Sequence, residues 1–212
     1  MSLTLIIGTK KWSSWSLRPW IAMKESKLPF KEIIIHLRQS DTRARILEYS
    51  AAGKVPILID GREMVWESLA ILDYLAVRFP EAKLWPQDVS AQAYARSISA
   101  EMHAGFPDLR RELPMDLGVE HPTPSPSAGA AADIERVQAI WRDARSRFGG
   151  AGPFLFGRFS NADAMYAPVV TRFHTYNVPV DPVSAAYIDT ILGLPSMKAW
   201  YRAADEEEVE EL

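Results

Sequence analysis

Cysteine is absent from the 212-residue sequence. The protein therefore contains no disulfide, no thiolate ligand for a metal and no redox-active thiol of its own. The four histidines show none of the spacings typical of metal ligands, so we expect no metal site. They are His36, His103, His121 and His174.

An excess of positive charge and long apolar runs are also missing. The net charge of -3 gives no reason to expect nucleic-acid binding. The longest apolar runs, such as LTLII at 3–7, are too short to span a bilayer. No basic segment precedes an apolar one at the N-terminus, so we expect a cytoplasmic protein without a secretory signal or a membrane partner. With 48% hydrophobic and 24% charged residues, the composition is typical of one large or two small globular domains.

Short apolar runs alternate with amphipathic segments in the first 79 residues. A strand, a crossover helix and a second strand indicate parallel pairing. The Asp60-Gly61 pair is typical of the turn in an antiparallel hairpin, so the predicted sheet is mixed. The predicted elements are strands at 3–8, 31–37, 55–60 and 62–66 and helices at 15–26, 40–49 and 68–79.

The second half contains only helical patterns. A linker at 80–88 with two prolines separates a small α/β domain at 1–79 from an all-helical domain at 89–212. The proline-rich segment 114–130 has no periodicity, which favours a flexible loop or a lid. The acidic end at 205–212 favours a solvated, frayed tail. Three apolar stripes at helical spacing predict core: Ala95, Ile98, Met102, Phe106 and Leu109; Ile134, Val137, Ile140, Trp141 and Ala144; and Met165, Val169 and Phe173.

Two dipeptides in the first domain suit a peptide-like ligand. Pro56 cannot donate to a strand ladder, and a cis Val55-Pro56 bond would turn the Val55 backbone outward toward such a ligand. The alternative is a proline that only begins an edge strand. At Glu67-Ser68, a helix N-terminus and a hydroxyl suit a carboxylate, and the glutamate suits an ammonium group. The alternative is that Glu67 and Ser68 only cap the helix.

The stretch WSSWSLR contains two adjacent serines, Ser13 and Ser14, just before a predicted helix. Such a serine either caps the helix or donates a hydrogen bond to a ligand thiolate. A free thiol has a pKa of about 8.5, and lowering it by two units requires about 2.7 kcal/mol. One or two charge-assisted hydrogen bonds together with a helix N-terminus are sufficient for that shift.

The motif FSNADA pairs Ser160 with Asp163, which predicts a capping box at the start of a core helix and no chemistry of its own. Together with the serine stretch, the VP pair and the ES pair, in this order, it resembles the glutathione S-transferase family over nearly the whole chain. The resemblance implies a thioredoxin-like domain followed by an all-helical domain. It also implies glutathione as co-substrate, a detoxification role and a homodimer.

The same resemblance implies roles for individual residues in glutathione binding. Val55 would pair its backbone with the cysteinyl part of glutathione, with Pro56 in the cis form. Glu67 and Ser68 would hold the γ-glutamyl group. Lys54 would meet the glycyl carboxylate, and its alternative interpretation is an ordinary solvent-exposed lysine.

In serine-type members of the family, the catalytic hydroxyl lies five residues before an arginine in the first helix. The position of Arg18 then indicates Ser13 as the hydroxyl that donates a hydrogen bond to the thiolate, with Ser14 as the second candidate. The SSxSxR pattern resembles the zeta class, which includes maleylacetoacetate isomerase, but Trp15 stands where zeta members usually carry cysteine. The first strand lacks the tyrosine of the alpha, mu and pi classes, and the absence of cysteine excludes the mixed-disulfide chemistry of omega- and beta-like members.

A second-substrate pocket is expected to be apolar and to lie between the domains. Trp12 and Trp15 flank the serines and suit one wall of it. His103 and Phe106 are predicted to share a helical face that suits another wall, and Arg110 would favour an acidic electrophile. Aromatic residues at helical spacing are also typical of core, so the assignment of His103 stays open.

Three functions are consistent with these residues. The first is a glutathione transferase that joins the glutathione thiolate to a small hydrophobic electrophile. The second is a zeta-like glutathione-dependent cis–trans isomerase, in which the thiolate adds to a conjugated diacid and leaves after bond rotation. The third is a non-catalytic binding module with the same fold.

Overall fold

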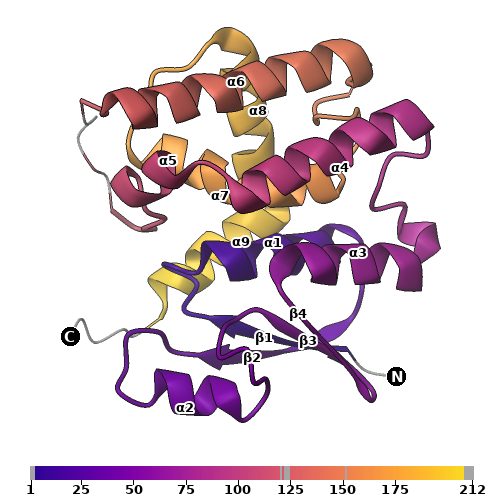
Figure 1. Cartoon of the computed structure of the whole chain (residues 1–212), viewed down its shortest axis with the longest axis vertical. Coiled ribbons are helices and arrows are strands. Elements are labelled where there is room, and N and C mark those ends of the chain that lie inside the picture. Colours follow the sequence, from indigo (N-terminus) through magenta and orange to yellow (C-terminus); the bar gives the residue numbers. More distant parts are fainter. Residues whose placement is uncertain (1–2, 120, 122–124, 151, 208–212) are drawn as a thin grey trace.

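The computed structural model describes residues 3–119, 121, 125–150 and 152–207. It has a sheet-containing N-terminal part and a helical C-terminal part, which confirms the predicted fold class (Figure 1). The strands are β1 (Leu3–Gly8), β2 (Phe30–Ile35), β3 (Ile57–Asp60) and β4 (Glu63–Trp66). The helices are α1 (Ser14–Glu25), α2 (Thr42–Leu47), α3 (Ser68–Arg78), the short 3₁₀ helix η1 (Pro80–Ala82), α4 (Val89–Ala104), α5 (Pro107–Glu112), α6 (Ala128–Phe148), α7 (Asn161–Thr175), α8 (Pro182–Gly193) and α9 (Pro195–Asp205).

The four strands form one mixed sheet in the order β2-β1-β3-β4. The β1–β2 pair is parallel, and the β1–β3 and β3–β4 pairs are antiparallel, as predicted from the crossover helix and the Asp60-Gly61 turn. Side chains alternate between the two faces of β1. Leu5 and Ile7 face the α1 and α3 side, whereas Ile6 packs with Ile46 of α2 on the opposite side.

The helical part packs onto the α1 face of the sheet around helix α7 (Figure 1). Nearly all of α7 is buried, and one apolar cluster continues from β1 and α1 through α4, α6 and α7. The predicted core stripes in α6 and α7 are buried, as expected from their spacing. The two parts therefore share a core, and the residues at the start of α1 are held in place by the helical part.

The predicted capping box at the start of α7 is confirmed. Asp163 Oδ2 accepts hydrogen bonds from Ser160 N (2.8 Å) and Ser160 Oγ (2.9 Å), and the Ser160 side chain in turn pairs with the N3 backbone N–H. Asp163 Oδ1 accepts from Leu155 N and from Tyr187 Oη, both at 3.1 Å. Burial raises the pKa of this carboxyl to about 6, against the opposing effect of these donors.

All five residues of the predicted stripe from Ala95 to Leu109 are buried, which confirms them as core, but they do not lie on one continuous helix because α4 ends at Ala104. Gly105 is the C-cap of α4, and Phe106 has a φ of +63° before Pro107 begins α5. A residue before proline is disfavoured in the right-handed helical region, which explains the break. Phe106 therefore does not follow His103 on one helical face, and its side chain is buried in the core.

The described part of segment 114–130 contains no helix or strand before α6, as its lack of periodicity predicted, but part of this loop packs against the rest of the chain. Met115 and Leu117 are buried, Leu117 N donates to Lys11 O (3.1 Å), and α6 already begins at Ala128. Residues 120 and 122–124 lie outside the described residues. This segment packs against the loop that precedes α1.

The predicted frayed tail is wrong up to residue 207. Glu207 Oε2 accepts from Lys10 N (2.7 Å) and Lys11 N (3.4 Å), and burial raises the pKa of this carboxyl. Trp200 Nε1 donates to Lys10 O (3.1 Å) from α9. The C-terminal helix thus fixes the loop between β1 and α1, and residues 208–212 lie outside the described residues.

Candidate functional site

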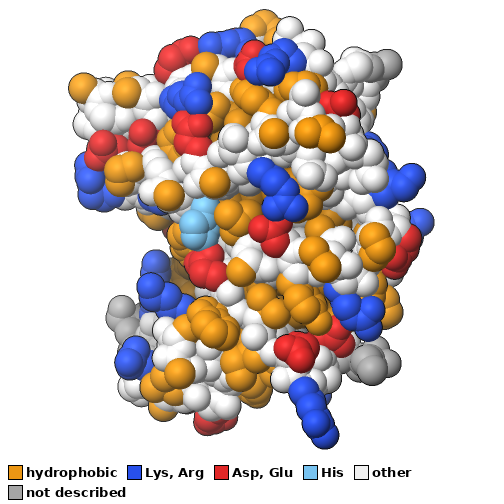
Figure 2. Space-filling model, turned by 45° about the vertical axis from the view of Figure 1, so that its right-hand side comes forward, with side chains coloured by type: hydrophobic (Ala, Val, Ile, Leu, Met, Phe, Trp, Pro, Cys, Tyr) orange, Lys and Arg blue, Asp and Glu red, His pale blue; other side chains and the backbone are white. Residues whose placement is uncertain are grey.

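A cavity of about 420 Å³ opens beside the N-terminus of α1. Figure 2 shows a hollow at the left edge of the molecule, between the helical part and the sheet-containing part, with histidine and acidic side chains at its rim. The walls of the cavity come from four separate segments of the sequence: the start of α1, the β2–α2 region, the loop before β3 and the β4–α3 junction. Its lining includes Trp12, Ser13, Trp15, Leu37, Lys54, Val55, Pro56, Trp66 and Glu67.

Ser13 and Ser14 occupy different environments. Ser13 holds the N-cap position of α1 and lines the cavity, but its side chain accepts no hydrogen bond from the first-turn N–H groups of the helix. Its Oγ lies 2.7 Å from Ser16 Oγ instead. Ser14 is the first residue of α1, is buried, and is not part of the cavity lining. The arrangement favours Ser13 as the hydroxyl that meets a ligand and argues against a simple cap.

The loop before β3 presents unpaired backbone to the cavity. The Val55-Pro56 peptide bond is cis, as the resemblance implied. Among the described residues, none hydrogen-bonds to the Val55 backbone, which leaves its N–H and C=O free for a ligand. Lys54 is exposed at the same edge of the cavity, where its ammonium group makes no ion pair with a described residue. A ligand with peptide groups and a carboxylate fits these donors and acceptors.

The β4–α3 junction aims Glu67 at the cavity. Glu67 has a φ of +78° and holds the N-cap position of α3. Its Oε2 lies 3.2 Å from His103 Nε2 of α4, so the carboxylate is held between the two parts of the chain. Ser68 is fully buried, its Oγ accepts from Arg18 Nη1 (3.3 Å), and it is not part of the cavity lining. Glu67 is thus a carboxylate in the lining of the cavity.

Trp15 contacts two guanidinium groups and one histidine ring. The guanidinium carbon of Arg18 lies 4.3 Å from the Trp15 ring centroid and that of Arg110 lies 5.0 Å from it, while His103 meets the ring edge-on at 5.3 Å between centroids. Such contacts stabilise the position of the indole. Trp15 is therefore a well-fixed wall of the cavity.

Trp12 forms a second aromatic wall. Its Nε1 donates to Asp116 Oδ1 (3.2 Å), and the Arg38 guanidinium lies 4.0 Å from its ring centroid. Arg38 is exposed and forms no ion pair with a described residue. The segment at 113–119 thereby supports the cavity from behind.

None of the three site residues predicted in the helical part lines the cavity, but His103 contacts the lining residues Glu67 and Trp15. Phe106 is buried core, because the helix break turns it away from the face of His103. Arg110 Nε donates to Gly105 O (3.0 Å), and its Nη2 donates to Met102 O. The Arg110 guanidinium therefore binds backbone carbonyl groups at the end of α4. Neither Phe106 nor Arg110 lines the cavity, although Arg110 contacts the lining residue Trp15.

A buried guanidinium lies behind the cavity. The pKa of Arg18 is lowered to about 9, first by burial and then by the charges of Arg110 and Arg172, while Glu67 acts in the opposite direction. Arg18 is therefore still a cation at neutral pH, and no described carboxylate forms an ion pair with it. Its charge and the N-terminus of α1 both favour an anion near Ser13.

Sequence patterns missed several lining residues. Leu37 and Ile46 were assigned to a strand end and a polar helix, and Trp66 to the end of a hairpin strand. The position of Trp66 directly before Glu67 was a signal that it borders the site. No local signal identifies Leu37 or Ile46, because their place in the lining depends on the packing of α2 against the sheet.

Within the described ranges, no helix is both long and apolar enough to cross a bilayer. In the same part of the chain, no group of three or more histidine, cysteine, aspartate or glutamate side chains is placed to hold a metal ion.

Comparison with known proteins places the chain in a family. Residues 12–78 match the model of the glutathione S-transferase N-terminal domain, and residues 91–203 match that of the C-terminal domain. The chain therefore belongs to the glutathione S-transferase family.

Individual relatives agree with this family. A probable maleylacetoacetate isomerase of Caenorhabditis elegans is 31% identical over 96 residues, which cover 45% of this chain and 44% of the relative. Glutathione S-transferase theta-1 of Mus musculus is 31% identical over 202 residues, which cover 88% of this chain and 76% of the relative. The chain spans less than two thirds of the length of several curated relatives that it matches.

The fold is shared with solved structures. A glutathione transferase homolog from Burkholderia gl BGR1 with bound glutathione has a TM-score of 0.74 and 21% sequence identity, with 98% of this chain and 100% of that chain covered.

Proposed function

We propose that this protein is a glutathione transferase in which the Ser13 hydroxyl stabilises the thiolate of glutathione beside a small hydrophobic electrophile. The observation that carries the proposal is that Ser13 lies at an N-cap position and on the cavity wall, yet does not cap its helix. Its hydroxyl is therefore available to a ligand thiolate.

The residues around Ser13 fit glutathione. The free backbone of Val55 suits the cysteinyl part, Glu67 suits the ammonium of the γ-glutamyl group, and Lys54 suits the glycyl carboxylate. Ser68 would contribute its backbone N–H at the α3 N-terminus, since its hydroxyl already accepts from Arg18. These groups bind the ligand at three points and leave the thiol to be placed at Ser13.

The protein lowers the barrier without forming a covalent bond to either substrate. A thiolate is the reactive form of the thiol, and a positioned donor together with positive potential shifts the equilibrium toward it. The cavity then holds the thiolate beside the electrophile, with Trp12 and Trp15 as apolar walls. The thiolate sulfur forms the new bond, and the electrophile loses its leaving group or takes up a proton.

The experiment that tests this function has two steps. The first is a thermal-shift titration with millimolar glutathione, because a ligand that binds the folded state raises its stability. The second is a panel of electrophiles assayed with glutathione, which should include aryl halides, organic hydroperoxides and a maleyl-type diacid. Stabilisation without turnover of any electrophile would favour the non-catalytic binding module, and no stabilisation would contradict every glutathione-dependent function.

A zeta-like isomerase is the second candidate. It is favoured by the similarity to the probable maleylacetoacetate isomerase and by the SSxSxR pattern. Arg110 does not line the cavity, so the carboxylates of a diacid would have to meet Arg38, whose guanidinium lies over the ring of Trp12. Turnover of the maleyl-type diacid in the panel, with glutathione regenerated rather than consumed, would support this candidate.

Replacement of Glu67 by alanine should weaken glutathione binding by about 10- to 100-fold, the range expected when a charge-assisted hydrogen bond is lost. Isothermal titration calorimetry measures the effect. Glu81→Ala removes an exposed glutamate of η1 and serves as the matched control with unchanged affinity. Equal affinities of the Glu67→Ala and wild-type proteins would show that Glu67 does not hold the ammonium group.

We also propose that the protein is a cytoplasmic homodimer that uses the edge of the sheet. Strand β4 is an edge strand, and Met64 on it is 44% exposed. Trp66 on the same strand is 52% exposed, and Val77 on the adjacent α3 is 80% exposed. Large apolar side chains grouped at one edge are typical of an interface.

Met64→Glu is expected to convert the dimer to a monomer, because it places a charge in the apolar interface. Sedimentation velocity distinguishes the two species. Val183→Glu changes a similarly exposed apolar residue of α8, at 40%, and should leave the dimer intact. A wild-type protein that sediments as a monomer would contradict the homodimer directly.

A further inference from the structure

The buried hydroxyl of Ser16 is in hydrogen-bond contact with Ser13, the residue proposed to donate a hydrogen bond to the thiolate. It lies one helical turn after Ser13 on α1 and is fully buried. Its Oγ has two polar contacts: it accepts a hydrogen bond from Gly8 N (3.0 Å) at the end of β1, and it lies 2.7 Å from Ser13 Oγ. Ser16 thus connects the fixed end of a central strand with the cavity.

The hydrogen-bond inventory of these groups determines which hydroxyl donates. A backbone N–H can only donate, so Gly8 occupies one acceptor site of Ser16 Oγ. The Ser16 proton then needs an acceptor, and Ser13 Oγ is its only other polar contact in the described part of the chain. If Ser13 donated instead, the Ser16 proton would be buried without a partner, an arrangement that folded proteins avoid.

We infer that Ser16 is a positioning residue that donates to Ser13 Oγ and so directs the Ser13 proton into the cavity. This inference rests on the proposed function of Ser13 as thiolate donor. The resulting chain runs from Gly8 N–H to Ser16 O–H and from Ser16 O–H to Ser13 O–H. Each bond polarises the next, so Ser13 becomes a stronger donor than an isolated serine. No covalent bond is made or broken in this chain.

The inference predicts how two substitutions combine. Ser16→Ala should raise the pKa of the thiol of bound glutathione by about half a unit to one unit, the size expected of one neutral hydrogen bond. Ser16→Ala should have no additional effect on that pKa in a Ser13→Ala background, because Ser16 acts only through the Ser13 hydroxyl. Glutathione affinity should stay nearly unchanged.

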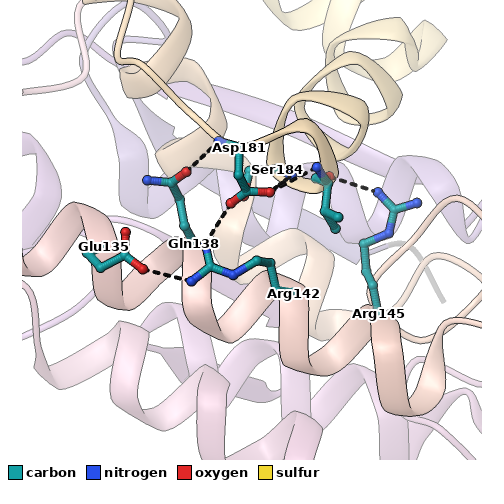
Figure 3. Close-up of polar contacts among 7 residues, drawn as sticks. Glu135, Gln138, Arg142, Arg145, Asp181 and Ser184 are labelled. Atoms are coloured by element: carbon teal, nitrogen blue, oxygen red, sulfur yellow. Dashed lines mark hydrogen bonds and ion pairs between the residues drawn. The ribbon is translucent and has the colours of Figure 1, made fainter.

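The pKa is measured from the ultraviolet absorbance of the bound thiolate as a function of pH, and affinity by calorimetry. Ser16→Thr keeps the hydroxyl and should restore the wild-type pKa. Ser184→Ala is the matched control: it removes another fully buried, hydrogen-bonded serine, in the Asp181 cluster at the start of α8 (Figure 3), and should not change the pKa.

Different outcomes identify different errors. An unchanged pKa in Ser16→Ala, together with a raised one in Ser13→Ala, would overturn the inference and leave the proposed function intact. An equal increase with and without Ser13 would show that Ser16 acts by a general structural effect, which also overturns it. An unchanged pKa in Ser13→Ala would refute the proposed function of Ser13 itself.

A second measurement needs no variant and covers the case in which Ser16→Ala does not fold. Neutron diffraction of the deuterated wild-type protein locates hydroxyl deuterons. We expect the Ser16 deuteron on the line to Ser13 Oγ and the Ser13 deuteron directed into the cavity. A Ser13 deuteron on the line to Ser16 Oγ would overturn the inference.

Discussion

Ser13→Ala is expected to raise the pKa of the thiol of bound glutathione by about one to two units, because a charge-assisted hydrogen bond to the thiolate contributes about 1.5–3 kcal/mol. Near neutral pH, turnover should fall by about 10- to 100-fold, since the fraction of thiolate falls with each unit. Affinity for glutathione should change little because Val55, Lys54 and Glu67 still hold the rest of the ligand. The thiolate titration and steady-state kinetics with the best electrophile of the panel measure these effects.

Ser14→Ala is the natural control for this prediction. Ser14 is the neighbouring serine, equally buried, but its side chain does not line the cavity. In the Ser14→Ala variant, we expect the pKa of the thiol of bound glutathione and the turnover to match those of the wild type. If Ser14→Ala slows turnover and Ser13→Ala does not, the spacing from Arg18 selected the wrong hydroxyl.

The pH profile separates a chemical role of Ser13 from a structural one. With the thiol pKa raised, the turnover of Ser13→Ala should keep increasing with pH and approach that of the wild type in alkaline solution. A variant that is merely misfolded would remain slow at every pH. Parallel pH profiles of the two proteins would therefore contradict the role of Ser13 in stabilising the thiolate.

Local patterns were sufficient to predict most of the fold. The apolar runs of β1 and β2, the Asp60-Gly61 turn and the stripes of α6 and α7 depend on neighbouring residues, so their periodicity is visible in the sequence. The capping box at Ser160 and Asp163 is equally local. The stripe through Met102 correctly predicted core residues, but it does not lie on one helix, because Phe106 precedes Pro107 and cannot continue α4.

The site was predicted in part for the same reason. Ser13, Val55 and Glu67 lie at element ends, where turn and cap residues make the position visible in the sequence. The contact between Glu67 and His103 joins two helices that are distant in the chain, and no pattern within either helix encodes it. Arg110 shows the opposite error: its charge suited a ligand, but the carbonyls exposed by the helix break already use its donors.

The second large expected effect concerns stability. Asp163→Ala removes the acceptor of four hydrogen bonds from Ser160, Leu155 and Tyr187 in a fully buried place. Buried donors without partners are costly, so we expect the free energy of unfolding to fall by about 3–5 kcal/mol. Urea denaturation measures it, and the loss of the α7 N-terminus should also lower the midpoint of thermal unfolding.

Asp181→Ala is the matched control for this loss, because Asp181 also holds the N-cap position of a helix and accepts several hydrogen bonds (Figure 3). Its side chain is partly exposed, so water can replace the lost acceptor, and the expected cost is about 1–2 kcal/mol. Equal losses in the free energy of unfolding for the two substitutions would show that burial does not increase the contribution of Asp163 to stability.

The two aspartates should also differ in their dependence on pH. The pKa of Asp163 is about 6 in the folded protein, above its ordinary value, so the folded state binds the proton more tightly and gains stability from this group as the pH falls from 7 toward 5. The cost of Asp163→Ala should therefore be about 1 kcal/mol larger at pH 5 than at pH 7. Burial raises the pKa of Asp181, but hydrogen bonds from Ser184, Arg142 and Val183 outweigh it and lower the pKa overall. Its contribution is lost only below the ordinary pKa of an aspartate, so the cost of Asp181→Ala should be the same at both pH values. An equal cost of Asp163→Ala at pH 5 and pH 7 would mean that the buried carboxyl keeps its ordinary pKa.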